Sequence, residues 1–216
     1  MILAIDTTHA FGSIALLADG RILEETLLHA EDGFGHVLYG HLSEMLDRHR
    51  LRLQDVDCFA AASGPGSFTG VRIGLACVKG LGEALQKPVA PVSNLQALAA
   101  FGSGPLRATL LDARRGEIYG AVYDADLNPV APERVMNLPD WLRTLPAGPI
   151  EFITADLAAF RPALAATAAP LIEAPRALAA AIARIAETNL RRGLTLDASQ
   201  VDANYVRRSD AELLFK

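Results

Sequence analysis

A glycine-rich loop at residues 63–74, Ser-Gly-Pro-Gly-Ser-Phe-Thr-Gly-Val-Arg-Ile-Gly, is the stretch of this sequence best suited to chemistry. It follows an apolar run at 58–62, typical of a buried strand, and a helix-like segment continues from it to Leu85. Glycine permits positive φ and close approach of another backbone, and the first turn of a helix presents free N–H groups to an anion. The loop therefore either holds a phosphate or only turns the chain from strand to helix.

The phosphate interpretation lacks several of the residues it needs. The pattern Gly64-x-Gly66-x-x-Thr69 has no third glycine of a dinucleotide fingerprint, and no Gly-Lys-Ser/Thr of a P-loop follows it. The loop also contains no lysine to meet a β- or γ-phosphate. Ser63 and Ser67 lie outside any Gly-x-Ser-x-Gly elbow and have no histidine beside them, so a hydrolase is disfavoured as well.

The histidines and cysteines give no metal-site pattern. His36 and His41 are five positions apart, which places them about 140° from each other around a helix. Two rings in that arrangement cannot easily chelate one ion, so no metal site is predicted. Cys58 and Cys77 lie in apolar segments, and we expect buried, reduced thiols in a cytoplasmic protein.

Composition places the chain among folded proteins that have a full hydrophobic core. It has 216 residues, of which 51% are apolar and 21% charged, enough for one large domain or two small ones. The net charge of −5 argues against a free-standing nucleic-acid binder, which is usually basic. Asp6 interrupts the N-terminal apolar run, which is therefore too short for a signal peptide or a membrane span.

The first half of the sequence predicts a three-stranded meander followed by alternating helices and strands. The meander has strands at 2–5, 11–17 and 22–28, with Asp19-Gly20 as the hairpin turn between the second and third. A helix at 36–49 carries apolar residues at spacings of three and four. The elements predicted after it are a strand at 58–62, a helix at 69–85, a strand at 89–92 and a helix from Ser93 to about Phe101.

The opening pattern recurs after a Gly-Ser-Gly-Pro linker at 102–105. A strand at 106–111 leads into Asp112, just as the first strand leads into Asp6, and strands at 118–123 and 130–136 follow. This repetition of strand, acid, strand, turn and strand indicates an internal duplication. The remaining predictions are a helix at 138–145, a strand at 150–154, a partly helical Ala-rich stretch at 155–170 and an amphipathic helix at 176–192.

The helix predicted at 69–85 contains an unusual number of glycines: Gly70, Gly74, Gly80 and Gly82. Each glycine in a helix interior costs ~1 kcal/mol relative to alanine, so the helix needs an offsetting gain. We favour the interpretation that a partner helix approaches this small-residue face closely, from this chain or from another. The alternative is tight packing of the glycines against the chain's own sheet.

Four segments in order resemble the TsaB (YeaZ) family of the bacterial tRNA threonylcarbamoyladenosine pathway: residues 2–8, 64–74, 112–119 and 205–207. The resemblance spans nearly the whole chain, and its glycine block is specific. It implies an α/β, duplicated ribonuclease-H-like fold of the actin-like ATPase superfamily, with two lobes that each contain a mixed sheet flanked by helices. We place the lobes at 1–102 and 103–216, with the tail after about residue 195 able to pack back on the first lobe.

The resemblance implies a scaffold rather than an enzyme. Members of the family bind and activate TsaD, the subunit that transfers the threonylcarbamoyl group to the adenosine next to the anticodon. TsaE, a small ATPase, joins the same assembly, and a family member that is alone forms a homodimer through the same helices. We therefore expect no cofactor in the isolated chain, ATP or ADP and metal on the partner subunits, tRNA contact only through the complex, and no membrane contact.

The same resemblance assigns candidate residues. It implies a family-motif loop made by Gly64, Pro65, Gly66, Ser67, Phe68, Thr69, Gly70 and Arg72. It implies partner-binding positions at His36, Tyr39, Leu42, Met45, Leu46, Val71, Gly74, Leu75, Cys77, Val78 and Leu81.

Actin-like ATPases place acids near metal-bound phosphate, so Asp6 and Asp112 are the candidates for a vestigial nucleotide site. The simpler interpretation, which we favour, is that both hold turns by side-chain-to-backbone hydrogen bonds. The competing function is an autonomous actin-like ATPase or kinase that uses these two acids and the loop at 64–70. Residues 153–156 stand where many members of the family have a glycine-rich turn, so a second phosphate loop is not expected.

Overall fold

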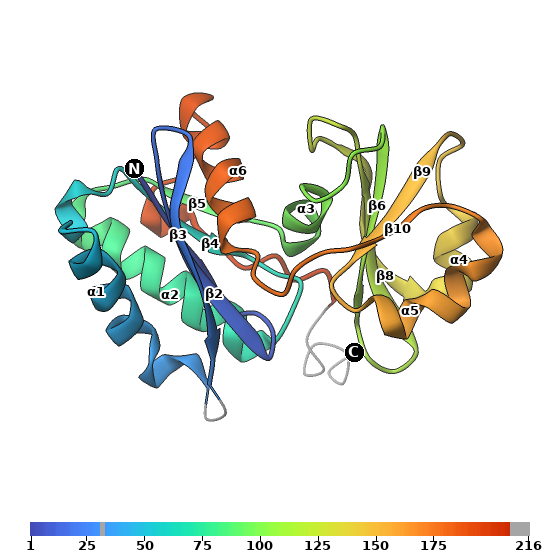
Figure 1. The fold of residues 1–216 in the computed structure, drawn as a ribbon, viewed down its shortest axis with the longest axis horizontal. Coiled ribbons are helices and arrows are strands. Elements are labelled where there is room, and N and C mark those ends of the chain that lie inside the picture. Colours follow the sequence, from blue (N-terminus) through green and yellow to red (C-terminus); the bar gives the residue numbers. More distant parts are fainter. Residues whose placement is uncertain (31–32, 208–216) are drawn as a thin grey trace. The chain divides into compact units, whose positions relative to one another are not determined.

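The computed structural model describes residues 1–30 and 33–207, and these fall into two compact units (Figure 1). The first unit contains residues 1–94 and 176–204. The second contains residues 95–175 and 205–207. Each unit is built on one five-stranded mixed sheet, so the predicted fold class of two mixed sheets flanked by helices is confirmed.

The sheet of the first unit has the strand order β3-β2-β1-β4-β5. Its central strand β1 pairs antiparallel with β2 and parallel with β4, and all five of its residues are buried. Asp19 and Gly20 both have positive φ (50° and 76°), which is the predicted hairpin turn between β2 and β3. The strands are Ile2–Asp6 (β1), Phe11–Ala18 (β2), Arg21–His29 (β3), Cys58–Ala62 (β4) and Val89–Val92 (β5).

Helices cover both faces of this sheet (Figure 1). Helices α1 (Leu38–Arg48) and α2 (Phe68–Leu85) lie side by side on one face, and α6 (Ala179–Arg191) lies on the other. Leu3 and Ile5 belong to the same core cluster as the buried residues of α1 and α2. Successive side chains on a strand point to opposite faces, which is why the neighbouring buried Ile2 and Ala4 are not part of that cluster.

The position of α6 differs from the division at 1–102 and 103–216, which placed it in the second lobe. The structure puts residues 176–204 in the first unit. The backbone N–H groups of Leu178 and Ala179 both donate to Oγ of Ser13 on β2, at 3.1 and 3.0 Å. These N–H groups have no partner inside the helix, so a buried serine on the sheet fixes the start of α6. A local sequence pattern cannot show such a long-range contact.

The tail that follows α6 also packs on the first unit, as the sequence analysis allowed. Leu196 pairs with Val89 of the edge strand β5, and Ala198 and Val201 join the core under α2. Nζ of Lys79 on α2 donates to the carbonyl oxygen of Val201 at 2.7 Å.

The second sheet repeats the first. Its order is β10-β9-β6-β7-β8, in which β6 pairs antiparallel with β7 and parallel with β9, as β1 does with β2 and β4. The predicted duplication is therefore a property of the topology. The elements of this unit are α3 (Asn94–Ala99, which starts at the boundary), β6 (Leu106–Asp112), β7 (Glu117–Tyr123), β8 (Pro129–Asn137), α4 (Leu138–Arg143), β9 (Ile150–Thr154), α5 (Leu157–Leu164) and β10 (Leu171–Glu173).

The short strand β10 is the only strand of the second sheet that the sequence analysis did not predict. The stretch at 155–170, which precedes β10, is partly helical, as expected, because α5 occupies half of it. Within the two described ranges, no helix combines the length and the apolar composition needed to cross a bilayer.

Candidate functional site

The glycine loop connects β4 to α2, and several of its hydrogen-bonding groups are already used within the first unit. The amide of Ser67 donates to the carbonyl oxygen of Thr8 at 2.7 Å, and the amide of Gly64 donates to Oδ1 of Asn94 at 3.0 Å. Oγ of Ser67 accepts from the amide of Gly70 and so caps α2. Three amides that could face a phosphate therefore bind protein atoms instead.

Close packing explains two of the loop's glycines. A Cβ on Gly66 would lie 2.7 Å from the carbonyl oxygen of Thr8, and one on Gly70 only 1.9 Å from that of Thr7. Neither backbone atom can move aside easily, so the loop can dock on the end of β1 only without side chains at these positions. The glycines thus fasten α2 to the central strand.

Asp6 holds the turn against which the loop docks. Its Oδ1 accepts from the amide of Thr8 at 2.9 Å and from the hydroxyl of the same residue at 2.6 Å. Nδ2 of Asn94 donates to that hydroxyl at 2.6 Å and so links the turn to the loop. Asp6 is fully buried, and its Oδ2 accepts no hydrogen bond from the described residues.

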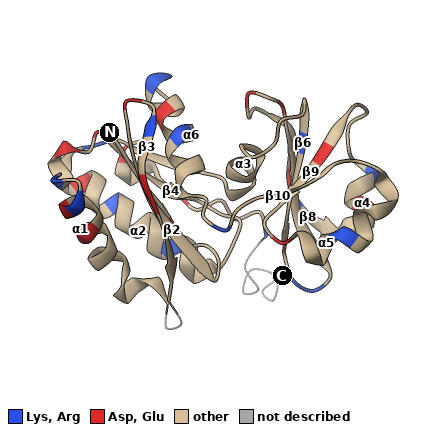
Figure 2. Cartoon of the chain, viewed as in Figure 1, with Lys and Arg blue, Asp and Glu red and all other residues tan. Residues whose placement is uncertain are grey.

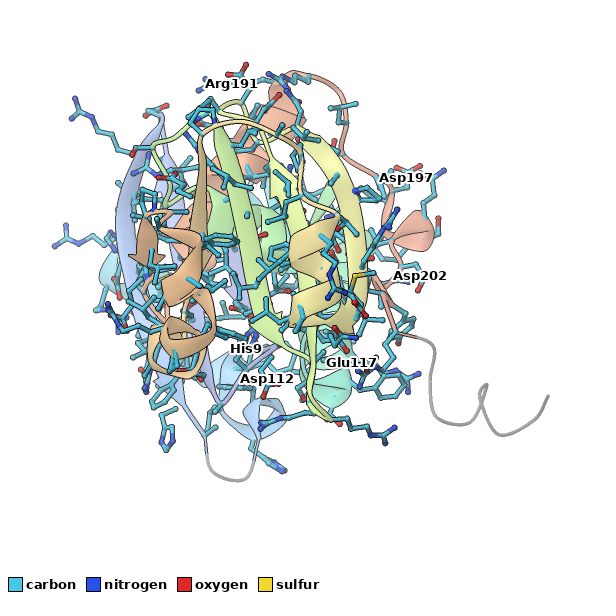
Figure 3. The ribbon with its side chains drawn as sticks, turned by 90° about the vertical axis from the view of Figure 1, so that its right-hand side faces the viewer. His9, Asp112, Glu117, Arg191, Asp197 and Asp202 are labelled. Carbon is cyan, nitrogen blue, oxygen red and sulfur yellow. The ribbon has the colours of Figure 1, made fainter. Side chains whose placement is uncertain are left out.

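Asp112 plays the same part at the corresponding place in the second unit. Its Oδ1 accepts from the amide of Arg114 at 2.7 Å, again two residues ahead, but the side chain is half-exposed. Figure 3 shows Asp112 and Glu117 at the two ends of the turn that joins β6 to β7. Both candidate acids therefore act as turn residues in the structure, which is the interpretation that the sequence favoured.

A latch that the sequence analysis did not identify holds the same turn. The guanidinium of Arg207 donates to the carbonyl oxygen of Ala113 at 2.8 Å and pairs with the carboxylate of Glu117. It also lies over the ring of Tyr119, 5.8 Å from the ring centre. The third and fourth motif segments of the sequence therefore meet in space. The sequence indicated that each of these two segments matches the family, but sequence alone does not reveal that the two segments are in contact.

Eight of the eleven residues of the predicted partner-binding set are buried in the chain's own first unit. Only His36 and Tyr39 are exposed, and Leu81 is intermediate. Gly74 is the clearest case, since a Cβ there would lie 2.8 Å from Oγ1 of Thr7 and 3.9 Å from the side chain of Ile5. The buried residues are Leu42, Met45, Leu46, Val71, Gly74, Leu75, Cys77 and Val78.

The glycines of α2 thus divide between the two explanations considered from the sequence. Gly70, Gly74 and Gly82 face neighbouring atoms of the chain's own first unit, so tight packing accounts for them. Gly80 is exposed, and a Cβ there would meet nothing within 4 Å. Gly40 of α1 is exposed and open in the same way, and it is a position that the sequence analysis missed.

Small side chains continue around these two open glycines on the solvent side of the helices. Ser43 on α1 and Ala76 on α2 are exposed, and so is Tyr39, with 61% of its surface accessible. A hydrogen bond joins the hydroxyl of Tyr39 to the thiol of Cys77, which ties the two helices together. Burial raises the pKa of that thiol to about 11, so Cys77 stays a neutral packing residue. We call this surface, formed by Tyr39, Gly40, Ser43, Ala76 and Gly80, the small-residue face.

Both of these helices carry charged residues. Figure 2 shows both signs on α1, and α2 contains Arg72, Lys79 and Glu83. The charged end of α1 is bound to the sheet by Glu24 of β3, which accepts hydrogen bonds from Arg48 at 2.5 Å and from Thr26 at 2.8 Å. In the part of the chain that the structure describes, no group of three or more His, Cys, Asp or Glu residues is placed to hold a metal ion.

Comparison with known proteins gives consistent relatives. The family model described as "TsaD: tRNA N6-adenosine threonylcarbamoyltransferase" matches residues 30–190. The tRNA threonylcarbamoyladenosine biosynthesis protein TsaB of Bacillus subtilis is 35% identical over 149 residues, which cover 67% of this chain and 65% of that protein. The TsaB protein of Escherichia coli is 36% identical over 131 residues, 59% of this chain and 56% of its own. The matched part thus spans between about half and two thirds of these relatives.

Similar solved structures cover a larger share of the chain than these sequence relatives do. A Pseudomonas aeruginosa protein described as similar to peptidase YEAZ has a TM-score of 0.79 and 26% identity, covering 95% of this chain and 99% of its own. YeaZ from the same organism has a TM-score of 0.77 and 27% identity, covering 94% and 98%. Component A of (R)-2-hydroxyglutaryl-CoA dehydratase from Acidaminococcus fermentans, at 10% identity and a TM-score of 0.55, shares the fold alone.

Proposed function

The chain belongs to the TsaD family of tRNA N6-adenosine threonylcarbamoyltransferases, within which it is similar to TsaB (YeaZ), and on this basis we propose that it is a non-catalytic scaffold in tRNA threonylcarbamoyladenosine biosynthesis. In this role it binds the TsaD subunit and holds it in its active form. TsaE joins the larger complex, tRNA is reached only through it, and ATP or ADP and metal belong to the partner subunits. The complex works in the cytoplasm.

The small-residue face carries this proposal. Gly40 and Gly80 sit inside helices and are exposed, and a Cβ at either position would meet nothing within 4 Å, so no close packing there offsets their helix cost of ~1 kcal/mol each. A helix of another chain that packs on this face would gain close backbone approach at both positions. The five residues of the small-residue face carry no charge, which suits such packing, because burying a charge without a partner is expensive. Without TsaD, a second copy of this chain occupies the same face.

The state of the loop and the acids supports a scaffold over an enzyme. The amides of Gly64, Ser67 and Gly70 are engaged within the protein, and Asp6 and Asp112 each hold a local turn. These are the groups that an autonomous ATPase or kinase would need for phosphate and metal.

Co-expression with the TsaD homologue of the same organism tests the proposal. The wild-type chain is expected to co-purify with TsaD, and the modification assay on tRNA is expected to require both. Ala76→Arg and Gly80→Leu fill the small-residue face with bulk, and each is expected to weaken TsaD binding by at least about tenfold. Both positions are exposed, so the variants should keep the fold.

Thr188→Arg on the exposed side of α6 is the matched control, since it adds the same bulk on the opposite face of the same sheet. Its binding to TsaD should equal that of the wild type. Unchanged binding in both Ala76→Arg and Gly80→Leu would remove the face from the proposal. Full tRNA modification by TsaD without this chain would remove the scaffold role itself.

A further inference from the structure

The second unit contains a pocket whose lining includes no residue of the glycine loop or of the small-residue face. It has a volume of about 390 Å³, within the range of sites that hold small molecules or single side chains. Its walls come from residues 104–105 of the Gly-Ser-Gly-Pro linker, from 148–151 at the start of β9 and from 167–170 before β10. Three prolines (Pro105, Pro149 and Pro170) and Ile150 make most of the wall apolar.

One buried charged residue lies among these walls. Glu151 is only 5% exposed, and within the described part of the chain it is the single charged residue that lines the pocket. Its Oε1 accepts from the amides of Ser103 at 2.6 Å and Gly104 at 2.8 Å. Its Oε2 is bound by neither linker amide. It is not among the fully buried polar atoms that lack a partner, so it is open to the pocket, where a ligand can donate to it.

The neighbouring cation of the protein is already engaged elsewhere. Arg107 on β6 stands in register with Glu151 on β9, but its Nε donates to the carbonyl oxygen of Gly104 and its Nη1 to that of Ala99. The guanidinium of Arg107 therefore binds the backbone of Ala99 and of the linker. No hydrogen bond from its guanidinium reaches Oε2.

We propose that this pocket binds a guanidinium or primary ammonium group carried on an aliphatic stem. Oε2 of Glu151 accepts from the charged head, and a charge-assisted hydrogen bond of this kind is stronger than a neutral one. The proline and alanine walls cover the stem, since lysine and arginine bury their methylene groups while the head finds a polar partner. Both oxygens of Glu151 then have donors, and the linker amides keep theirs.

Titration followed by ¹⁵N–¹H NMR of the whole protein tests this proposal. The probes are n-butylammonium and n-propylguanidinium, with n-butanol as the neutral comparison. Saturable shifts are expected at the amides of Gly104, Gly148 and Ala168 for the two cations and not for the alcohol. Glu151→Gln keeps one oxygen that can accept from the linker amides, but it removes the negative charge and replaces the other oxygen with an amide nitrogen. The affinity of this variant for both cations should therefore fall by at least about tenfold.

A second variant keeps the test decisive if Glu151→Gln does not fold. Ala168 is exposed at the pocket wall, so Ala168→Lys places a repelling charge there and should also weaken binding by at least about tenfold. Ala166→Lys is the matched control, because it is exposed in the same segment but does not line the pocket. It should bind like the wild type.

The two sources of such a group are separated by one further pair of probes. L-arginine represents a free metabolite, and the peptide acetyl-Gly-Arg-Gly-amide represents a side chain of a partner protein. Whichever binds more tightly identifies the source. Equal binding of n-butanol and the cations, no saturable shift with either cation, or unchanged affinity in both Glu151→Gln and Ala168→Lys would overturn the proposal.

Discussion

At the scale of single residues, buried polar side chains join segments that are distant in sequence. Ser13 caps the start of α6, Asn94 joins the glycine loop to the turn after β1, and Arg207 closes the turn after β6. Each satisfies backbone groups that would otherwise lack a partner, and such groups cost about 1–3 kcal/mol when buried unpaired. Single polar side chains therefore position the loop and helices that the proposed function uses.

Glu24 gives a pH-dependent test at this scale. The hydrogen bond from Arg48, with others from Thr26 and His49, lowers the pKa of its carboxyl to about 2. Because the folded pKa lies below the unfolded value, near 4.3, the carboxylate stabilises the protein above that value, and this stabilisation is lost as pH falls towards 2. Glu24→Gln is therefore expected to destabilise the protein at pH 7 and to differ less from wild type at pH 3.

Urea unfolding at both pH values measures the effect. Glu44→Gln serves as the control, since the Glu44 carboxylate is mostly exposed and lies 4.0 Å from Arg48, farther than the carboxylate of Glu24 does. A deficit of Glu24→Gln that is as large at pH 3 as at pH 7 would contradict the assigned pKa shift.

At the scale of elements, α2 shows that glycines in one helix can have different causes. Gly70 and Gly74 let the helix sit directly on β1 and the turn that follows it, whereas Gly80 faces solvent. Assigning one average helix-propensity cost to all the glycines of α2 hides this difference, because the packing gain that offsets the cost depends on which atoms lie opposite each Cα.

The same substitution should therefore have opposite effects at two positions of α2. Gly70→Ala places a Cβ against the carbonyl oxygen of Thr7 and is expected to lower the free energy of unfolding by about 1–3 kcal/mol. Gly80→Ala adds a methyl group in open space and should raise it by up to ~1 kcal/mol. Chemical denaturation of both variants measures the two changes, and a loss of stability in Gly80→Ala would show that its surroundings are not open.

At the scale of the whole molecule, the same sheet topology occurs in both units, but the two units carry different features. The first unit carries the docked glycine loop and the small-residue face, and the second carries the Arg207 latch and the Glu151 pocket. The acid after the central strand is retained in both units as a turn residue. Each unit therefore keeps the same arrangement of strand, acid and turn.

The purified chain alone is accordingly expected to show no appreciable ATP hydrolysis. The loop has no lysine, and three of its amides together with Oδ1 of Asp6 are already bound within the protein. Phosphate release in the presence of Mg²⁺ measures this, with Asp6→Asn prepared in parallel. A robust turnover that disappears in Asp6→Asn would instead establish the ATPase alternative.

The sequence by itself determined every described strand except β10, the main helices, the internal duplication and the family. Each depends on short-range information, such as the apolar runs of β1 and β4, the Asp19-Gly20 turn and the specific glycine block. The interpretation of Asp6 and Asp112 as turn residues was also within reach, because the bond each makes spans only two residues.

Only the tertiary structure decided which faces are free. The apolar stripe of α1 and the glycines of α2 look alike whether they meet the chain's own sheet or a partner, so eight buried residues were assigned to the partner surface and Gly40 was missed. The placement of α6 and the pairing of Glu151 with the linker also depend on long-range contacts. Periodicity records that a residue is buried, whereas the three-dimensional arrangement records what buries it.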